Sequence, residues 1–438
     1  MVEVMEKKSP FYPDKPVPVE LFVGRESELN RVVERGMGQV KQGKSVSFFV
    51  RGDYGIGKSS LARFLAWKAE TQHGLFPVYA QLAGCKSLND IAVAVLQAVI
   101  DTELYNPKLW KEHLGEFLGN FIGEVEIPGF GYNFEKLRRQ APNLVSHHGL
   151  LHFLRSIYTK IKSGESNGIF LILDEIHGVA SQSEFAQFLK GLWDTNAMQG
   201  KDSHVPLLLM LCGEEHRRRA LIESHEPVGS IFDVIDVNPL SAEESKVFFK
   251  RAFDYAFMQY RPEAIDRMAG WSSGYPKIMH LIGDAVYWAH SSGEPVTERE
   301  AYKGIQEACE MIGRKYFEPN VLHALESEDY ASILKKFADN LKASWSTVFT
   351  RAGVKAWLSR EEQSKTDNFL SRMKILHTIE PTGAKGEYKI INNMIFMYII
   401  TKFSSKDLIN RRNKTTKPCR EGESDHCFEK ALEERSFL

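Results

Sequence analysis

Residues 45–65 read SVSFFVRGDYGIGKSSLARFL, and this stretch decides the fold. Its first six residues, Ser45–Val50, form a short apolar run that predicts a buried strand. The loop that follows matches the pattern G-x-x-x-x-G-K-S completely, and an amphipathic helical pattern begins directly after it. A strand, a glycine loop and a helix in this order predict a phosphate-binding loop that faces the N-terminus of a helix.

This loop predicts a site for a nucleoside triphosphate with Mg²⁺. Backbone N–H groups of the loop would surround the β-phosphate, and Lys58 would place its charge on the β- and γ-phosphate oxygens. The hydroxyl of Ser59 would ligate Mg²⁺. The predicted nucleotide-binding residues here are Gly52, Asp53, Tyr54, Gly55, Ile56, Gly57, Lys58, Ser59 and Ser60.

Composition indicates an ordinary globular protein of two or three domains, with 438 residues, 43% hydrophobic and 26% charged. No apolar run approaches the roughly 18 residues that span a bilayer, and the N-terminus has no apolar signal-peptide segment. Five scattered cysteines favour a reducing compartment, so we expect a cytoplasmic protein with no membrane partner. Cys419, His426 and Cys427 in the polar C-terminal stretch have a poor spacing for zinc, and we predict no metal site there.

Charge is unevenly distributed along the chain. Residues 331–415 hold 16 Lys or Arg and 7 Asp or Glu, a balance of +9, whereas the whole chain carries −1. A basic C-terminal module on an acidic body indicates a polyanionic partner such as duplex DNA. A solvated surface that is merely basic is the alternative.

Hydrophobic runs alternate with helical patterns in the first half of the chain, which predicts an α/β fold with a five-stranded parallel sheet. Strands are predicted at Ser45–Val50, Phe76–Leu82, Ile169–Leu173, Leu207–Leu211 and Phe232–Val237. Helices are predicted at Glu26–Val40, Leu88–Ile100, Gly149–Lys162, Ser183–Leu192 and Glu215–Glu223.

The predicted domains follow from these patterns and from changes in composition. They are an extended arm over residues 1–21, a P-loop core over 22–240, a helical lid over 241–325, a winged helix-turn-helix over 330–405 and a mobile tail over 406–438. Residues 101–145 are an insertion in the core that fits no single period, and its role stays open.

The winged helix-turn-helix prediction depends on three helical patterns followed by a hairpin. The helices are expected at Tyr330–Asn340, Ser346–Val354 and Glu361–His377, and residues 383–400 (GAKGEYKIINNMIFMYII) are expected to form a glycine turn and a strand. The last helix of such a module lies in the DNA major groove, with flanking cations on phosphates. The predicted DNA contacts are Lys365, Arg372 and Lys374 on the helix, and Lys385 and Lys389 on the wing. Docking to a protein is the alternative for this module.

Residues 169–177 (IFLILDEIH) complete the nucleotide site in this reading. A buried strand delivers Asp174 and Glu175 to its carboxyl end, the edge at which open parallel sheets bind ligands. Asp174 would hold Mg²⁺ directly or through water, and Glu175 would orient or deprotonate the attacking water. An acidic pair at a helix N-terminus is the structural alternative.

Four segments together resemble the AAA+/STAND group of P-loop ATPases, and in particular the archaeal-type, initiator-like members with a C-terminal winged helix. They are FVGRESEL at 22–29, GDYGIGKSS at 52–60, IFLILDEIH at 169–177 and GYP at 274–276, and the resemblance covers roughly residues 12–400. It implies ATP and Mg²⁺ as cofactors and ATP hydrolysis as the activity.

The same resemblance implies further ATP-binding residues. Phe22, Val23 and Gly24 would pack against adenine, and Arg25 would anchor the arm or the edge of the base. In the lid, Pro276 would contact adenine and Lys277 is the nearest candidate for a second-sensor cation. Without the family, FVGR is an ordinary lead-in to a helix, and GYP is a helix start with proline in its first turn.

Two departures from the family pattern bear on hydrolysis. The fourth strand ends in LLLMLCGEE at 207–215, so Cys212 or Glu214 would have to serve as the polar sensor. Ile231 stands where relatives have an arginine that reaches a neighbouring subunit. Arg217 and Arg218 in HRRRA could replace that arginine, unless they only form a solvated helix face. Such an arginine, called an arginine finger, accelerates ATP hydrolysis, so its absence predicts slow intrinsic turnover of ATP.

The sequence therefore predicts an ATP-hydrolysing switch that couples its nucleotide state to DNA binding, homo-oligomeric assembly and recruitment of an effector protein. The alternative is a signalling or defence regulator in which ATP controls oligomerisation and the winged helix binds protein. A nucleotide-binding scaffold with negligible turnover is a third possibility.

Overall fold

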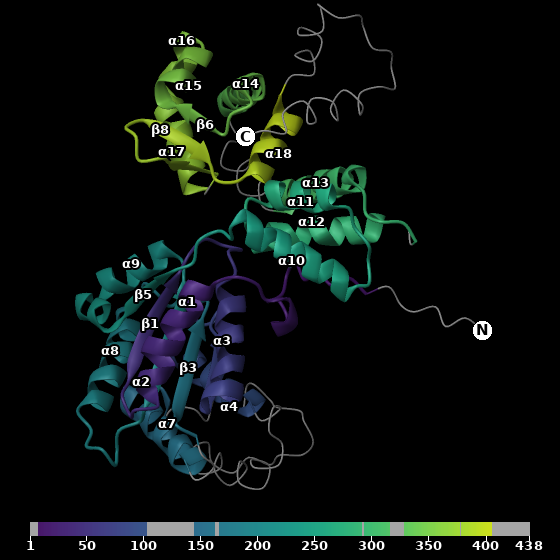
Figure 1. The fold of residues 1–438 in the computed structure, drawn as a ribbon. Helices are drawn as coiled ribbons and strands as arrows, with labels where there is room; N and C mark the ends of the chain where they lie inside the picture. Colours follow the sequence, from purple (N-terminus) through teal and green to yellow (C-terminus); the bar gives the residue numbers. More distant parts are fainter. Residues whose placement is uncertain are drawn as a thin grey trace, which may run out of the picture. The chain divides into compact units, whose positions relative to one another are not determined.

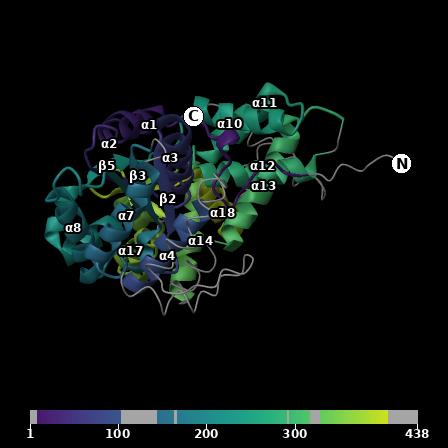
Figure 2. The same ribbon diagram turned by 90° about the horizontal axis from the view of Figure 1, so that it is seen from below.

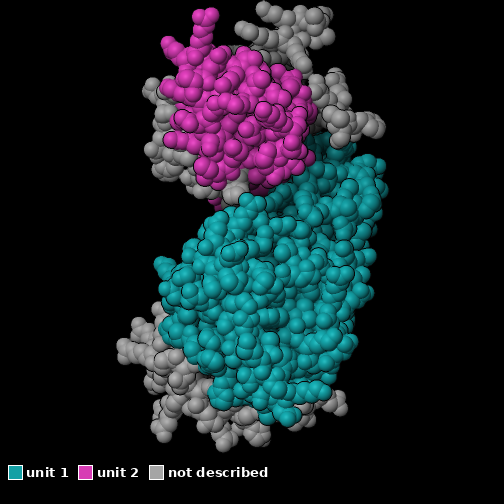
Figure 3. Space-filling model, turned by 90° about the vertical axis from the view of Figure 1, so that its left-hand side faces the viewer, with its two compact units in different colours: residues 1–304 teal, residues 305–438 magenta. Residues whose placement is uncertain are grey.

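The computed structural model describes residues 8–102, 144–162, 166–290, 293–315, 328–376 and 378–404. Residues 103–143 of the predicted insertion, the predicted tail and the cysteines and histidine in it lie outside this part of the chain. The chain divides into two compact units, Met1–Gly304 and Ile305–Leu438, which Figure 3 colours separately. The domain boundaries predicted from the sequence stay predictions.

Unit 1 is built on a five-stranded parallel sheet with the strand order β2-β3-β4-β1-β5. The strands are β1 (Val46–Arg51), β2 (Leu75–Gln81), β3 (Gly168–Asp174), β4 (Leu207–Gly213) and β5 (Asp233–Asp236). The predicted α/β fold with five parallel strands is confirmed, and each predicted strand ends within two residues of its observed bounds. Two of these strands are apolar almost throughout, because helices cover both faces of the sheet.

Helices before and after the glycine loop cover one face of the sheet. They are α1 (Glu26–Arg31), the π-helical η2 (Val32–Met37), α2 (Gly38–Val40) and α3 (Lys58–His73). Phe48, Phe170 and Met210 face this side, where they pack against Met37 and Leu65. Figure 2 shows α1, α2 and α3 on the opposite side of the strands from α4 (Leu88–Thr102) and α7 (His147–Lys162).

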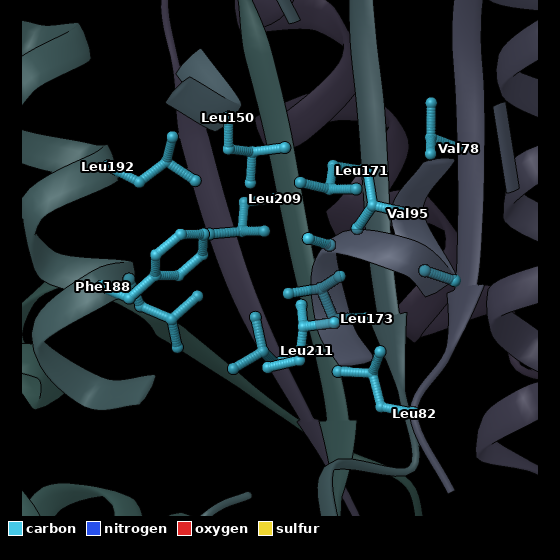
Figure 4. Packing of buried hydrophobic residues seen from close by; sticks show 14 of the residues in the cluster. Val78, Leu82, Val95, Leu150, Leu171, Leu173, Phe188, Leu192, Leu209 and Leu211 are labelled. Atoms are coloured by element: carbon cyan, nitrogen blue, oxygen red, sulfur yellow. The ribbon is translucent and has the colours of Figure 1, made fainter. Parts of the chain in front are cut away.

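The second face carries the larger apolar core. Besides α4 and α7, it is covered by α8 (Ser183–Ala197), α9 (Glu215–Ser224) and the 3₁₀-helix η6 (Glu226–Ile231). Figure 4 shows Leu171, Leu209 and Leu211 of the central strands directed at Leu150 and Phe188 of the covering helices. Successive strand residues therefore alternate between two apolar layers, which holds the carboxyl edge of the sheet in place.

A helical lid follows the sheet in unit 1, and α10, α11 and α12 pack against one another in it (Figure 1). Its helices are α10 (Ala242–Tyr255), α11 (Pro262–Ser272), α12 (Pro276–Ala289) and α13 (Glu298–Ile312), of which α13 runs past the boundary between the units. Ser241 and Glu244 form a capping box that starts α10.

The N-terminal arm packs into this lid. Phe11 is buried among aromatic rings of α10, with its ring centroid 5.6 Å from that of Phe253 in an edge-on contact. Gly283 of α12 makes room for it, because a Cβ there would lie 2.1 Å from the Phe11 ring. The arm continues to η1 (Val19–Leu21), and on the way the Val17 N–H donates to Ser60 Oγ at 3.2 Å.

Unit 2 contains a small antiparallel sheet with the order β6-β8-β7, and helices flank its strands in the sequence. Its elements are α14 (Glu328–Ser344), β6 (Val348–Thr350), α15 (Arg351–Trp357), α16 (Arg360–Gln363), α17 (Thr366–Ile375), β7 (Ile379–Pro381), β8 (Glu387–Ile390) and α18 (Asn393–Phe403). Helices followed by the β7–β8 hairpin fit the predicted winged helix-turn-helix.

Three predictions of secondary structure in this unit were wrong. Residues 346–354 form β6 and then a helix, because the Thr350 hydroxyl accepts from the Gly353 N–H and starts α15 only there. Residues 361–376 form two helices rather than one, and a capping box at Ser359 starts the first. The end of the predicted wing strand is α18, which Asn392 caps by accepting from the Ile395 N–H.

No helix in the described ranges is both long enough and apolar enough to cross a membrane.

Candidate functional site

The glycine loop joins β1 to α3 at the carboxyl edge of the sheet. Gly55 and Gly57 have φ values of +78° and +97°, a left-handed region that residues with a Cβ rarely adopt. The Lys58 ammonium donates to the carbonyl oxygens of Gly52 and Asp53, both at 2.8 Å. Burial lowers the pKa of Lys58, and the nearby acidic group of Glu214 acts in the opposite direction. The loop therefore places a cation at its own centre.

Asp174 ends β3 at the same edge and is only 1% exposed. Its Oδ1 accepts from the Glu175 N–H at 2.9 Å, and its Oδ2 accepts from the Tyr79 hydroxyl. The thiol of Cys212, at the end of β4, also interacts with this carboxylate, and burial raises the pKa of that thiol well above its usual value. The predicted magnesium ligand is thus a buried carboxylate with several donors around it.

Glu175 follows in a strained backbone conformation, with φ +58° and ψ +56°. A left-handed conformation costs roughly 1–2 kcal/mol for a residue with a side chain, and such residues cluster at functional sites. The Gln81 amide at the end of β2 donates to Glu175 Oε2 at 3.4 Å. The turn and the Gln81 contact therefore hold the predicted catalytic carboxylate next to the end of β2.

Glu214 lies just beyond β4 and forms a charged cluster with two histidines. Its Oε2 is 3.6 Å from Nε2 of both His177 and His216. The bond to His177 holds the pKa of Glu214 at about 2, and the same bond raises the pKa of His177. Of the two candidates for the polar sensor, Glu214 is the charged one and Cys212 is fully buried.

The start of α12 contacts the glycine loop directly. The Tyr275 hydroxyl donates to Asp53 Oδ2 at 3.1 Å, and the Lys277 N–H donates to the Gly55 carbonyl at 3.2 Å. The Lys277 ammonium donates to the Tyr54 hydroxyl at 2.9 Å and lies 4.5 Å from the centre of that ring. A Cβ on Gly57 would lie 3.5 Å from Pro276, in ordinary contact. The structure thus brings together the predicted loop and lid residues.

Arg25 connects the FVGR segment to the loop. Its guanidinium donates to the Ile56 carbonyl at 2.9 Å and to the Asn238 carbonyl, and its backbone N–H donates to Glu244 at 3.2 Å. The side chain is only 7% exposed, and burial lowers its pKa. These bonds join the FVGR segment to the glycine loop, and the role of Arg25 in ATP binding stays a prediction.

The predicted adenine contacts Phe22, Val23 and Gly24 lie near α3 or α10. The ring of Phe22 stacks on Phe64 with centroids 4.2 Å apart, and Val23 is buried. Gly24 lies so close to α10 that a Cβ would be 2.2 Å from the Glu244 carboxylate. Their contact with adenine stays a prediction.

The donor set at this edge fits magnesium. Ser59 lies in the first turn of α3 and Asp174 ends β3, so a hydroxyl and a carboxylate are available, and hard oxygen ligands of this kind suit Mg²⁺. Mg²⁺ bound there would neutralise charge on the phosphate oxygens.

Solved structures with this arrangement of elements show what kind of core it is. The Aeropyrum pernix ORC2 protein, in its ADPNP-ADP complexes, matches at a TM-score of 0.55 with 13% identity, over 86% of this chain and 94% of that one. The Walker-type ATPase PABY2304 of Pyrococcus abyssi matches at 0.51 with 15% identity, over 86% of this chain and 96% of that one. The chain therefore has the P-loop ATPase fold of these two proteins.

Sequence comparison adds a match to the first part of this core. The family model for the BREX system ATP-binding protein BrxC/D matches residues 19–98, which include FVGR, the glycine loop and α3. No curated protein sequence matches the chain at a significant level.

The two arginines predicted to replace the AAA+ arginine finger lie at the start of α9. Arg218 is held by Glu215 of its own helix, with Nε at 2.9 Å and Nη2 at 3.0 Å from the two carboxylate oxygens. Arg51 at the end of β1 binds the same carboxylate at 2.7 Å. The Arg217 Nε is buried and has no hydrogen-bond partner among the described residues. The finger role stays a prediction for both.

The cations predicted to contact DNA lie on α17 and the hairpin of unit 2. The Arg372 guanidinium is 4.8 Å from the centre of the Tyr330 ring, and the Lys374 ammonium is 5.7 Å from that of Tyr388. Lys389 pairs with Glu380 across the hairpin at 2.8 Å. Lys365 is the residue before α17, at its N-cap position, and Lys385 is exposed in the hairpin turn.

The sequence analysis missed Tyr79, Tyr275 and Glu244 as parts of the candidate site. Tyr79 lies in a predicted strand. Tyr79 and Gln81 are two residues apart, so both side chains are expected on the same face of that strand, and this was the available signal. Tyr275 is part of the GYP motif, for which the sequence analysis predicts an adenine contact only through Pro276. Nothing in the sequence indicates that Glu244 reaches Arg25, because 219 residues separate them.

Proposed function

We propose that this protein is an ATP-dependent switch that binds ATP with Mg²⁺ and hydrolyses it slowly. The observation that carries the proposal is the contact between the start of α12 and the glycine loop, through Tyr275 and Lys277. The loop residues that bind these lid side chains belong to the segment that would hold phosphate. Arrival or loss of a γ-phosphate would therefore change the lid contacts, and such differential contact is what a ligand-driven switch requires.

Each residue of the site has one role in this proposal. Lys58 binds the β- and γ-phosphates, while Ser59 and Asp174 hold Mg²⁺. Glu175 orients or deprotonates the attacking water, and Phe22, Val23, Gly24 and Pro276 pack against the base. Lys277 moves from Tyr54 to the γ-phosphate when ATP is bound, which is how the lid reads the nucleotide.

The contacts of Arg218 on α9 support the proposal that ATP is hydrolysed slowly. Arg218 is engaged by a carboxylate of its own chain, so its use in a neighbouring subunit requires that ion pair to break. An arginine finger contributes about 10³- to 10⁵-fold in rate. We therefore propose that hydrolysis accelerates on homo-oligomeric assembly, when Arg217 or Arg218 reaches a neighbouring site.

The output of the switch is proposed to be duplex DNA binding by unit 2 and recruitment of an effector protein. The +9 balance of residues 331–415 supports this output, as do the cations Lys365, Lys374 and Lys385 on α17 and the hairpin. The Lys389–Glu380 ion pair favours the second candidate, in which this unit docks a protein and ATP controls oligomerisation, because a lysine that is already paired offers less charge to phosphate.

Calorimetric titration of ATP, with a parallel measurement of phosphate release, tests the central claim. Lys58→Ala is expected to weaken ATP binding by roughly 10- to 100-fold, the effect of one lost charged hydrogen bond. Glu175→Gln is expected to retain binding and lose about 10²- to 10⁴-fold in turnover.

Exposed residues of the same types provide matched controls. Lys41→Ala and Glu184→Gln lie on the surface of unit 1 and are expected to behave as wild type in both measurements. Equal ATP affinity in wild type and Lys58→Ala would rule out the proposal. ATP turnover that is equal in Glu175→Gln and wild type would instead support a nucleotide-binding scaffold with negligible hydrolysis.

A further inference from the structure

Tyr79 brings a hydroxyl group to the buried carboxylate at the end of β3. In the parallel register of β2 and β3, Tyr79 pairs with Ile172 and Gln81 pairs with Asp174. Tyr79 is therefore the diagonal neighbour of Asp174 on the sheet face toward α3, within reach of a long side chain. Its hydroxyl donates to Asp174 Oδ2.

The carboxylate of Asp174 is fixed from both sides. The Glu175 N–H binds Oδ1 at 2.9 Å, so the Tyr79 bond to Oδ2 determines how the plane of the carboxylate is turned. The group is 1% exposed, and a buried carboxylate needs such donors to offset the loss of water. Removing one donor would free the carboxylate to rotate and weaken its hold on any cation.

Tyr79 is itself held in place. The guanidinium of Arg63, on α3, lies 4.8 Å from the centre of its ring. A phenylalanine would fill the same volume, so packing gives no reason for the hydroxyl, whereas the bond to Asp174 does.

We propose that Tyr79 is a positioning residue of the magnesium site, acting through Asp174 without contacting the nucleotide. This inference rests on the proposed nucleotide function, since it concerns the cation that accompanies ATP. Partners behind a metal-ligating group typically change metal affinity by roughly 10- to 100-fold when they are removed. The role therefore predicts a defect confined to binding that depends on Mg²⁺.

The test is calorimetric titration of a non-hydrolysable ATP analogue into wild type and Tyr79→Phe, once with excess Mg²⁺ and once with EDTA. Wild type is expected to bind more tightly with Mg²⁺. Tyr79→Phe is expected to lose roughly 10- to 100-fold in affinity with Mg²⁺ and to match wild type in EDTA. The EDTA measurement also shows that the variant is folded.

Two further variants make the assignment specific. Tyr302→Phe is the matched control, because Tyr302 is a buried tyrosine that likewise has an arginine, Arg267, over its ring, at 5.6 Å. It is expected to behave as wild type. In an Asp174→Asn background, Tyr79→Phe is expected to have no additional effect on Mg²⁺-dependent binding, because the two residues act as one unit.

Each other outcome overturns a defined claim. Equal Mg²⁺ dependence in Tyr79→Phe and wild type overturns the positioning role alone, and so does an equal loss with and without Mg²⁺, which would show a structural role. Wild-type protein that binds no analogue overturns the proposed function together with this inference. A full additional loss in the Asp174→Asn background shows that Tyr79 does not act through Asp174.

Discussion

Arg25 shows how a single charged residue can join three parts of a fold. It is almost fully buried, and its guanidinium and backbone bind the carbonyls of Ile56 and Asn238 and the carboxylate of Glu244. Its backbone has a φ of +66°, which a residue with a side chain adopts only at a cost. The contacts therefore outweigh the strain in the folded state.

Arg25→Ala is expected to reduce the free energy of unfolding by about 1–3 kcal/mol, because buried carbonyl groups lose their donor. Arg25→Gly is expected to be less destabilised than Arg25→Ala by about 1 kcal/mol, since glycine adopts the left-handed conformation freely. Urea unfolding measures both. Arg35→Ala, at an exposed arginine of η2, is the control, and a loss no larger than that of the control would contradict the anchoring role.

The loop itself was predictable residue by residue, because glycine spacing and the Lys-Ser pair carry their own geometry. Asp174 and Glu175 were predictable because a strand of uninterrupted apolar residues ends in two acids. Tyr79 was not, because its partner lies 95 residues away and only the register of β2 on β3 brings the two together. Short-range patterns do not encode such diagonal contacts.

At the scale of elements, the N-terminal arm and α12 are joined by a buried histidine. The Tyr12 N–H donates to His280 Nδ1 at 3.0 Å, and the Phe11 and Phe248 rings pack beside the imidazole. Burial lowers the pKa of His280 to about 3. The imidazole is therefore neutral in the folded protein near pH 7 and acts as an acceptor.

Acid is expected to destabilise unit 1 through this residue. The unfolded histidine takes up a proton near its ordinary pKa of about 6.5, whereas the folded one does so only near pH 3, so protons favour the unfolded chain between these values. The contribution is fully present above about pH 6.5, and it is lost as the pH falls, by up to about 1.4 kcal/mol per pH unit.

Unfolding free energies of wild type and His280→Asn from pH 7 to pH 4 measure this effect. Asparagine retains an acceptor and does not titrate, so the variant is expected to show a flatter pH dependence. His152→Asn, at an exposed position of α7, should follow the wild-type curve. Parallel curves for wild type and His280→Asn would contradict the assignment.

Elements were predictable from the sequence wherever burial imposed a clear pattern. β3 and β4 are buried at every position and read as apolar runs bounded by turns, which is why their positions were predictable. The apolar run at the C-terminal end of unit 2 was read as a strand, but it is α18, in which nearly every residue from Met394 to Ile400 is buried. A short run that is apolar on all sides has no period to distinguish helix from strand.

At the scale of the whole molecule, positive charge is concentrated in residues 331–415, the part of unit 2 that is proposed to bind DNA. We expect duplex DNA binding to fall with salt, with a slope of log K on log salt of about −0.9 for each phosphate neutralised. The triple change of Lys365, Lys374 and Lys385 to Glu is expected to reduce the magnitude of that slope by about 3, measured by fluorescence anisotropy at several salt concentrations.

A triple variant with the same net charge is the control. Lys41, Lys44 and Lys201 are exposed lysines of unit 1, and their change to Glu is expected to leave the slope nearly unchanged. If the slope of log K on log salt changes equally in both triple variants, DNA binding depends on net charge alone. Absence of DNA binding in wild type would instead favour protein docking by unit 2.

The seating of Phe11 has a mechanical consequence for nucleotide exchange. The arm is fastened at one end between α10 and α12 and at the other, through Val17, to the first turn of α3. Any swing of the lid away from the loop must stretch this tether, slide it, or detach one of its ends. If the proposed function holds, this arm would limit how far the lid opens, and with that the rate at which nucleotide leaves the site.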